Sequence, residues 1–163
     1  MIPPAASRVQ EVLRALGVPT EVLVLAESAR TAAQAAAACG VAVGQIVKSL
    51  VFLADRDPIL VLVSGANQAD EQRLTAVTGR AVRRADADTV RAVTGYAIGG
   101  VPPVGHARPL PVLIDRDLLA FERVIAAAGT PHAVFPITPG ELCRVTGGRV
   151  EDLKRRAAGA APA

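Results

Sequence analysis

The chain reads Gln45-Ile-Val-Lys48-Ser-Leu-Val-Phe-Leu53, then Asp55-Arg-Asp-Pro58, then Ile59-Leu-Val-Leu-Val-Ser64. The two apolar runs have the length and the β-branched content of strands, and the polar residues between them are typical of a turn. Together they predict a β-hairpin. Because the second run is almost entirely apolar, its strand is expected to be buried on both faces of a sheet.

Lys48 lies inside the first of these apolar runs. It is one of two lysines in the chain, and the other cationic side chains are all arginine. An ammonium group is costly to bury without a partner, and lysine supplies a compact charge with three hydrogen-bond donors. Lys48 is therefore a candidate functional residue. The alternative is a lysine on the solvent-facing side of a half-buried strand.

Capping residues and periodicity predict the elements around the hairpin. Helices are expected over 8–16 with Ser7 as cap, after Thr31, Asp70, Asp86 and Thr138, and over 150–157. Strands are expected over 21–25, 81–82, 96–98, 111–115 and 132–137, whereas residues 121–128 fit either a helix or a strand. Helices and strands mix without a regular βαβ alternation, which favours one α+β domain with a mixed sheet. The domain is expected to span 1–157, and 158–163 to form a disordered tail.

The bulk composition narrows the class of protein. No uninterrupted apolar stretch reaches the ~20 residues of a membrane helix, and the N-terminus lacks the charged and apolar regions of a signal peptide. We therefore expect a cytoplasmic protein in which Cys39 and Cys143 are small buried hydrophobic residues. The sequence pI is about 9.4. Arginines are concentrated in residues 80–91 and 149–156. They form either a surface that binds the phosphates of a ligand or an ordinary solvated surface.

The segment from Gly99 to Pro109 is the most irregular part of the sequence. The adjacent Gly99 and Gly100 allow backbone N–H groups to approach a ligand oxygen closely, and the prolines behind them stiffen the loop. Such donors stabilise an oxyanion during acyl transfer. The alternative is a plain wide connection. The chain has no dinucleotide fingerprint, no Gly-x-Ser-x-Gly elbow and no second ligand at metal spacing from His106 or His132.

Five motifs then occur in a fixed order. They are Gln45-Ile-Val-Lys48-Ser-Leu-Val-Phe52, Val61-Leu-Val-Ser-Gly-Ala-Asn67, Gly95-Tyr-Ala-Ile-Gly-Gly-Val-Pro-Pro-Val-Gly-His106, Pro111-Val-Leu-Ile-Asp115, and Ala127-Ala-Gly-Thr-Pro-His132 ending in Thr138-Pro-Gly-Glu-Leu142. In this order they resemble the YbaK/EbsC family, which includes the editing insertion domain of bacterial prolyl-tRNA synthetase and its free-standing relatives. The resemblance extends from about Val9 to Leu153.

The resemblance implies an α+β domain with a mixed, largely antiparallel sheet flanked by helices. It also implies that residues 121–128 contribute a strand to a hairpin around Gly129. The implied activity is hydrolysis of the ester in mischarged aminoacyl-tRNA, in particular tRNA for proline carrying a small wrong amino acid such as Ala or Cys. The expected partners are the tRNA acceptor end and, as a further candidate, prolyl-tRNA synthetase, with no cofactor, metal or membrane.

The residues are carried over position by position. Lys48 matches the essential lysine of the family, and Gly99 and Gly100 match its glycine loop, so these three are the expected catalytic residues. Substrate contacts are expected from Ser49, Asn67, Gly105, His106 and His132. The amino-acid specificity stays open for two reasons. Position 49 is a serine, which does not identify a branch of the family. The glycine loop resembles that of the cysteine-removing branch, whereas His132 resembles the histidine of the insertion-domain branch.

Two other classes of function remain alternatives. One is a non-catalytic module that binds an aminoacyl-adenosine, a nucleotide or a protein partner. The other is a metal or serine hydrolase of small esters. The presence of Lys48, the two glycines and His132 together favours the editing enzyme, because a pure binder does not need all of them.

Overall fold

The predicted hairpin forms the middle of the structure. β2 (Ile46–Ala54) and β3 (Asp57–Ser64) pair antiparallel, with Val47 opposite Ser64. Every residue of β3 except Asp57 is buried. The apolar run of β3 is therefore covered on both faces, as its composition predicts.

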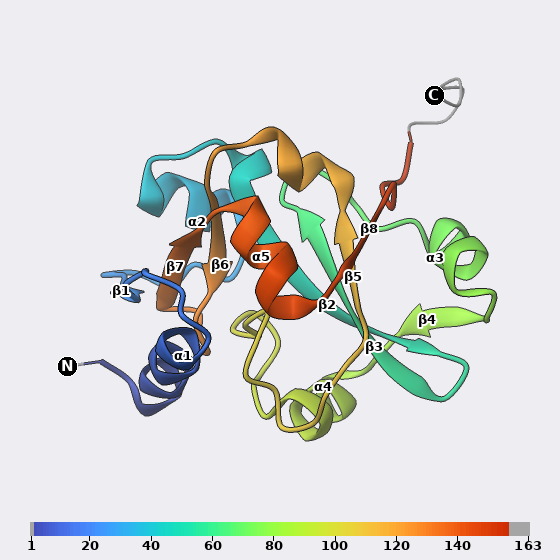
Figure 1. The fold of residues 1–163 in the computed structure, drawn as a ribbon, viewed down its shortest axis with the longest axis horizontal. Coiled ribbons are helices and arrows are strands. Elements are labelled where there is room, and N and C mark those ends of the chain that lie inside the picture. The colour runs from blue at the N-terminus through green and yellow to red at the C-terminus, as the bar shows by residue number, and fades with distance from the viewer. Residues whose placement is uncertain (1, 157–163) are drawn as a thin grey trace.

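Eight strands form one mixed sheet within residues 2–156, the part of the chain that the computed structural model describes (Figure 1). The order is β1-β7-β6-β2-β3-β5-β8, and β4 also pairs with β2. The pairs β2–β6, β3–β5 and β5–β8 are parallel, and the others are antiparallel. The remaining strands are β1 (Leu23–Val24), β4 (Val82–Arg84), β5 (Val112–Asp115), β6 (Val124–Ala127), β7 (Ala133–Ile137) and β8 (Arg149–Glu151).

Five α-helices flank the sheet in the described residues. They are α1 (Pro4–Ala15), α2 (Ala32–Cys39), α3 (Glu71–Thr78), α4 (Ala87–Thr94) and α5 (Pro139–Thr146). The predicted caps at Thr31, Asp70, Asp86 and Thr138 each accept a backbone N–H of the first turn. Short 3-10 turns, η1 (Val43–Gln45) and η2 (Arg116–Ala120), precede β2 and follow β5. The α+β class, the mixed sheet and the β6–β7 hairpin around Gly129 are thus confirmed.

The helices cover both faces of the sheet. Val47 and Val51 of β2 pack in the core cluster that contains buried residues of α1, α4 and α5. Phe52 of the same strand packs with Leu74 of α3 on the opposite face. α2 covers the end of the sheet formed by Ile46, β6 and β7. This alternation along β2 decides which of its side chains share a face.

Three expected elements differ in the structure. The first helix begins at Pro4, and Ser7 lies inside it without capping it. Pro4 starts the helix well because its fixed φ suits the first turn, where no N–H partner is required. The apolar face also begins earlier than expected, at the buried Ala6.

No helix of the described residues has the length and apolar character to cross a bilayer.

The other two corrections concern strands. Residues 96–98 lie in a turn rather than a strand, with Tyr96 buried and Ile98 56% exposed. Residues 150–156 are not helical, because β8 pairs with β5 and places Val150 beside Ile114. Sheet pairing has overridden a helical pattern there. Ala157 and the predicted tail at 158–163 lie outside the described residues.

Candidate active site

One edge of β2 is open in its middle. β6 pairs with this edge only at Ile46 and Val47, and β4 pairs with it only from Phe52 onward. The C=O of Val51 accepts the N–H of Ala85, just after β4, at 3.1 Å, so residues 48–50 have a neighbour on the β3 side alone. Backbone groups of alternate strand residues point to the same edge. Because the C=O of Ile46 accepts the N–H of Gly65 on the β3 side, the backbone N–H and C=O of Ser49 point toward the open edge.

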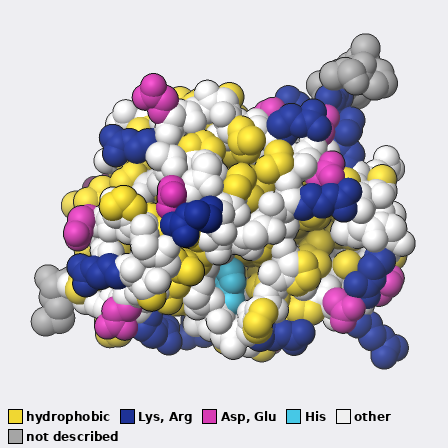
Figure 2. Space-filling view, in the orientation of Figure 1, with side chains coloured by type: hydrophobic (Ala, Val, Ile, Leu, Met, Phe, Trp, Pro, Cys, Tyr) yellow, Lys and Arg dark blue, Asp and Glu magenta, His cyan; other side chains and the backbone are white. Residues whose placement is uncertain are grey.

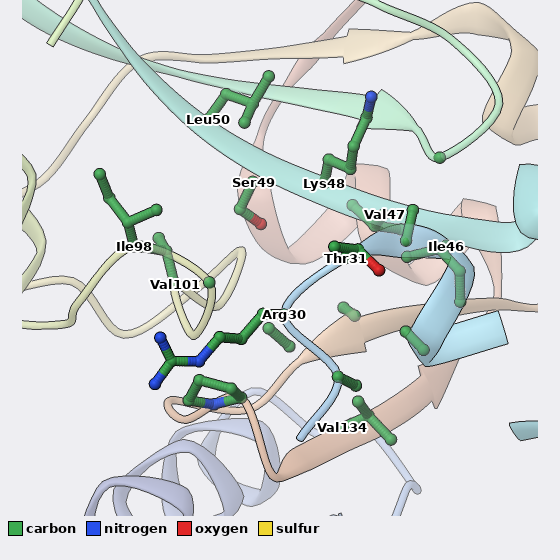
Figure 3. Close-up of a pocket in the computed structure, with 18 of the residues that line it drawn as sticks. Arg30, Thr31, Ile46, Val47, Lys48, Ser49, Leu50, Ile98, Val101 and Val134 are labelled. Carbon is green, nitrogen blue, oxygen red and sulfur yellow. The ribbon is translucent and has the colours of Figure 1, made fainter. Parts of the chain in front are cut away.

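A cavity of about 440 Å³ lies along this open edge (Figure 3). Its size is that of a site for a small ligand. The walls come from β2, the segment that leads into α2, the Gly99 loop and the β6–β7 hairpin, and they are mainly small or aliphatic. They include Ala32, Ala35, Ile46, Val47, Leu50, Val51, Ile98, Val101, Ala126 and Val134.

Lys48 stands at the border of this cavity. Its side chain is half-buried, and its Nζ donates a hydrogen bond to the main-chain carbonyl of Asn67. It forms no salt bridge with an acid of the described residues. Burial lowers the pKa of Lys48, the nearby Arg84 lowers it further, and the Asp115 carboxylate opposes both effects. The structure thus holds a cation that the protein does not neutralise.

Asn67 fixes the carbonyl that holds this lysine. Its Nδ2 donates to Asp115 Oδ2 at 2.8 Å and to Asp117 Oδ2 at 2.9 Å. Asp115 is 1% exposed and also accepts the backbone N–H of Ser64 at 3.0 Å. Asn67 therefore contributes its backbone to Lys48 and its side chain to the loop, and it does not line the cavity.

Ser49 projects from the opposite face of β2. Figure 3 shows its hydroxyl on the side of Arg30 and Val101, away from the Lys48 amine. The hydroxyl oxygen is buried and has no hydrogen-bond partner among the described residues. Buried hydroxyls in proteins nearly always have a partner. An unpartnered hydroxyl in the wall of an apolar cavity suits a polar atom of a bound ligand.

The two glycines of the loop have different surroundings. Gly99 lines the cavity with φ +92°, a conformation that glycine adopts without strain. Gly100 is buried, its N–H donates to Ala97 O at 3.0 Å, and its C=O accepts the N–H of Gly129 at 2.9 Å. The sequence predicts that both amides of this pair are free to face a ligand. In the structure the amide of Gly100 is already bonded, so this prediction does not hold for Gly100. Gly100 instead joins the loop to the β6–β7 hairpin.

The remaining predicted residues lie elsewhere. His106 is half-buried, and its Nε2 hydrogen-bonds to Pro102 O at 2.7 Å within the loop; burial lowers its pKa more than this bond raises it. Gly105 packs against Val12 of α1 and borders a separate hollow. His132 is exposed, between two residues that line the cavity but not itself among the lining residues. The structure thus brings Lys48, Ser49 and Gly99 to one cavity and leaves these residues outside it.

A family model described as an aminoacyl-tRNA editing domain matches residues 26–145. The matched segment runs from the residue after Leu25 to the end region of α5 and so contains every wall of the cavity. The chain belongs to the aminoacyl-tRNA editing domain family.

Similarity to individual proteins supports this family assignment. A crystal structure described as that of a candidate trans-editing enzyme for prolyl-tRNA synthetase is 49% identical, with TM-score 0.92, over 96% of this chain and all of that chain. YwhH of Bacillus subtilis, whose function is not characterised, is 34% identical over 71% of this chain and 74% of its own length. EbsC of Enterococcus faecalis, named as a candidate Cys-tRNA(Pro)/Cys-tRNA(Cys) deacylase, is 25% identical over 71% of this chain and 77% of its own length.

Two cationic residues of the candidate site are not among the site residues predicted from the sequence. Arg30, directly before the Thr31 cap, lines the cavity near Gly99 and Pro131. Arg84 lines it from β4. The only signal for Arg84 is its place in an arginine-rich segment, and position alone does not separate it from Arg83. Within residues 2–156, no three His, Cys, Asp or Glu side chains are grouped as metal ligands would be.

Proposed function

We propose that this editing domain is a deacylase that hydrolyses the ester of mischarged aminoacyl-tRNA, with tRNA for proline carrying a small wrong amino acid such as Ala or Cys as the substrate. The observation that carries the proposal is the cavity at the open edge of β2, with the Lys48 ammonium at its border. The aminoacyl group would occupy the cavity, and the terminal adenosine would lie over Lys48.

The proposed chemistry uses no protein nucleophile and no metal. The attacking oxygen is that of a water molecule, which adds to the ester carbonyl and gives up the proton that the departing ribose oxygen takes. The resulting negative charge on the carbonyl oxygen is stabilised by the Lys48 ammonium or the Gly99 amide, and the ribose oxygen then leaves with a proton. Gly100 contributes by holding Gly99 in place through its bond to Gly129. Fixed donors at the site of developing charge need no reorganisation during the reaction.

The substrate's polar groups have candidate partners. The Ser49 hydroxyl is suited to the α-amino group or a ribose hydroxyl, because it is buried at the cavity wall without another partner. His132 lies outside the cavity and is exposed, so we assign it contact with the nucleoside rather than with the amino-acid side chain.

A small cavity suits the editing task. One methylene changes binding by only about 1–3 kcal/mol, so a synthetase site rejects smaller analogues poorly and a second, smaller sieve is required. The aliphatic and alanine walls suit a short apolar side chain. The chain would meet the acceptor end alone or together with prolyl-tRNA synthetase, the enzyme that the 49% identical relative is named for.

The test is a deacylation panel. Alanyl, cysteinyl, seryl and threonyl esters are prepared on tRNA for proline and on their cognate tRNAs, and release of amino acid is followed with and without EDTA. We expect release of at least one small amino acid from tRNA for proline, sparing of prolyl-tRNA, and no effect of EDTA. Tight binding without release would instead support a non-catalytic binding module, and a loss of activity in EDTA would support a metal hydrolase.

A further inference from the structure

A second hollow lies on the other side of Lys48. Its volume is about 490 Å³, and it faces α3, because Gln68, Ala69 and Glu71 form one wall. Lys48, Leu50 and Arg84 line both this hollow and the cavity described above. The two spaces therefore meet at the open edge of β2, and a ligand that fills the cavity can continue past Lys48 into the second hollow.

The cations of this hollow come from two distant parts of the chain. Arg84 lies on β4 and Arg155 follows β8, and both side chains line the hollow with Lys48. One member of each arginine-rich segment of the sequence thus reaches the same place. The Arg84 guanidinium lies over the Phe52 ring, 5.5 Å from its centroid, and Arg155 Nη1 donates to Gln68 Oε1 at 3.5 Å. Both residues are exposed and so accessible to a ligand.

These cations have no acidic partner among the described residues, unlike many of the others. Seven salt bridges involve Arg73, Arg80, Arg144, Arg149, Lys154 and Arg156. Figure 2 shows cationic and acidic side chains interspersed on the face that it draws, rather than one broad basic patch. Among the residues that the structure describes, one acid, Glu71, lines the hollow, against three cations. The hollow therefore has a local excess of positive charge.

We propose that the hollow formed by Lys48, Arg84 and Arg155 binds the backbone phosphates immediately before the terminal nucleoside of the tRNA acceptor strand. This inference rests on the proposed function, since it places the aminoacyl end in the adjoining cavity. Arginine suits the role because its fork of donors matches phosphate oxygens. The strand enters over α3, passes Lys48 at the terminal nucleoside, and delivers the ester to the open edge of β2.

The test compares one amino acid on two substrates. The first is the aminoacyl-tRNA, and the second is the same amino acid esterified to adenosine, which has no phosphate. The variant is R84A/R155A. The matched control is R56A/R83A, which removes two exposed arginines that line neither space and form no salt bridge within residues 2–156. Binding of an uncharged minihelix ending in CCA is measured in parallel as a function of salt concentration.

R84A/R155A should lower kcat/KM relative to the wild type on both substrates. We expect the factor of loss to be on the order of 10-fold larger for aminoacyl-tRNA than for aminoacyl-adenosine. Each phosphate contact to a single strand contributes about 0.7 to the slope of log K against log salt, so the minihelix slope should fall by about 1.4. The control variant R56A/R83A should keep a slope closer to that of the wild type. Equal losses on both substrates, an unchanged slope, or no minihelix binding by the wild type would overturn the phosphate site.

The parallel binding measurement separates this inference from the proposed activity. If the wild type hydrolyses neither ester but binds the minihelix with a slope that depends on Arg84 and Arg155, the deacylase proposal fails and the phosphate site stands. If it hydrolyses both esters and the double variant behaves like its control, the deacylase stands and the phosphate site is wrong.

Discussion

The Lys48 ammonium donates to the main-chain carbonyl of Asn67, nineteen residues further along the chain. This contact joins the open edge of β2 to the loop that follows β3. The Asn67 side chain anchors that loop on Asp115 and Asp117. A neutral carbonyl positions an ammonium group without neutralising its charge, which leaves the charge of Lys48 available to a substrate.

Asn67→Ala should weaken both the fold and the reaction. The buried Asp115 loses a donor, which costs about 1–3 kcal/mol in the free energy of unfolding. Because the loop that holds Lys48 then loosens, kcat should fall more than the affinity for substrate. Urea denaturation and single-turnover deacylation measure the two effects. Gln72→Ala, an exposed change on α3, serves as the control, and equal behaviour of the two variants would contradict the role of Asn67.

The pH profile of deacylation should report Lys48. Burial and the charge of Arg84 lower its pKa from the ordinary value of 10.5. Because the charged form is the useful one, activity should fall as pH rises through a value below 10.5. Arg84→Ala removes a repulsive charge, so the alkaline limb should move to higher pH, whereas Arg83→Ala should leave it in place. An alkaline limb that Arg84→Ala does not move would exclude Lys48 as its source.

Ser49→Ala should separate stability from activity. Removing a buried hydroxyl that has no partner is expected to stabilise the protein by about 1 kcal/mol. If the hydroxyl binds the substrate, kcat/KM should nevertheless fall about tenfold, the equivalent of one hydrogen bond to a charged group. Thermal unfolding and steady-state deacylation measure the pair. A fall in stability together with unchanged kcat/KM would show that Ser49 is structural.

The glycine loop gives a prediction about packing. A Cβ at Gly100 would lie 2.8–2.9 Å from backbone atoms of Gly129 and Thr130, so Gly100→Ala should cost about 1–3 kcal/mol and displace Gly99. Gly140, in the first turn of α5, has nothing within 4 Å of such a Cβ. Gly140→Ala should therefore be neutral or stabilising by up to about 1 kcal/mol. Matching denaturation midpoints for the two variants would be inconsistent with the clamped loop.

Local signals predicted most of the fold. The hairpin over residues 45–64 follows from two apolar runs around a polar turn. Four helix caps follow from the hydrogen-bonding of Thr and Asp side chains to backbone groups within three residues. The failure at the last strand is non-local. Residues 150–156 have a helical pattern, but their place beside β5 is decided by a strand over thirty residues earlier in the chain. Pairing of this kind leaves little trace in a local pattern.

The sequence predicts the main residue of the candidate site, Lys48, but not the cavity beside it. An isolated lysine in an apolar run marks Lys48 from sequence alone. The open edge of β2 exists because β6 and β4 stop short of each other, and both partners lie more than twenty residues away. For the same reason the sequence could not separate Gly99, which lines the cavity, from Gly100, whose amide is already bonded to Ala97.

The most direct test uses the two lysines of the chain. Lys48→Met and Lys154→Met each remove one charge while keeping the apolar stem, and Lys154 forms a partly exposed salt bridge with Asp117 of the kind that contributes little stability. Single-turnover hydrolysis of alanyl- and cysteinyl-tRNA for proline is then compared with the wild type. The account predicts a loss of ~10²-fold or more for Lys48→Met and less than about threefold for Lys154→Met. Full activity of a folded Lys48→Met variant would contradict it.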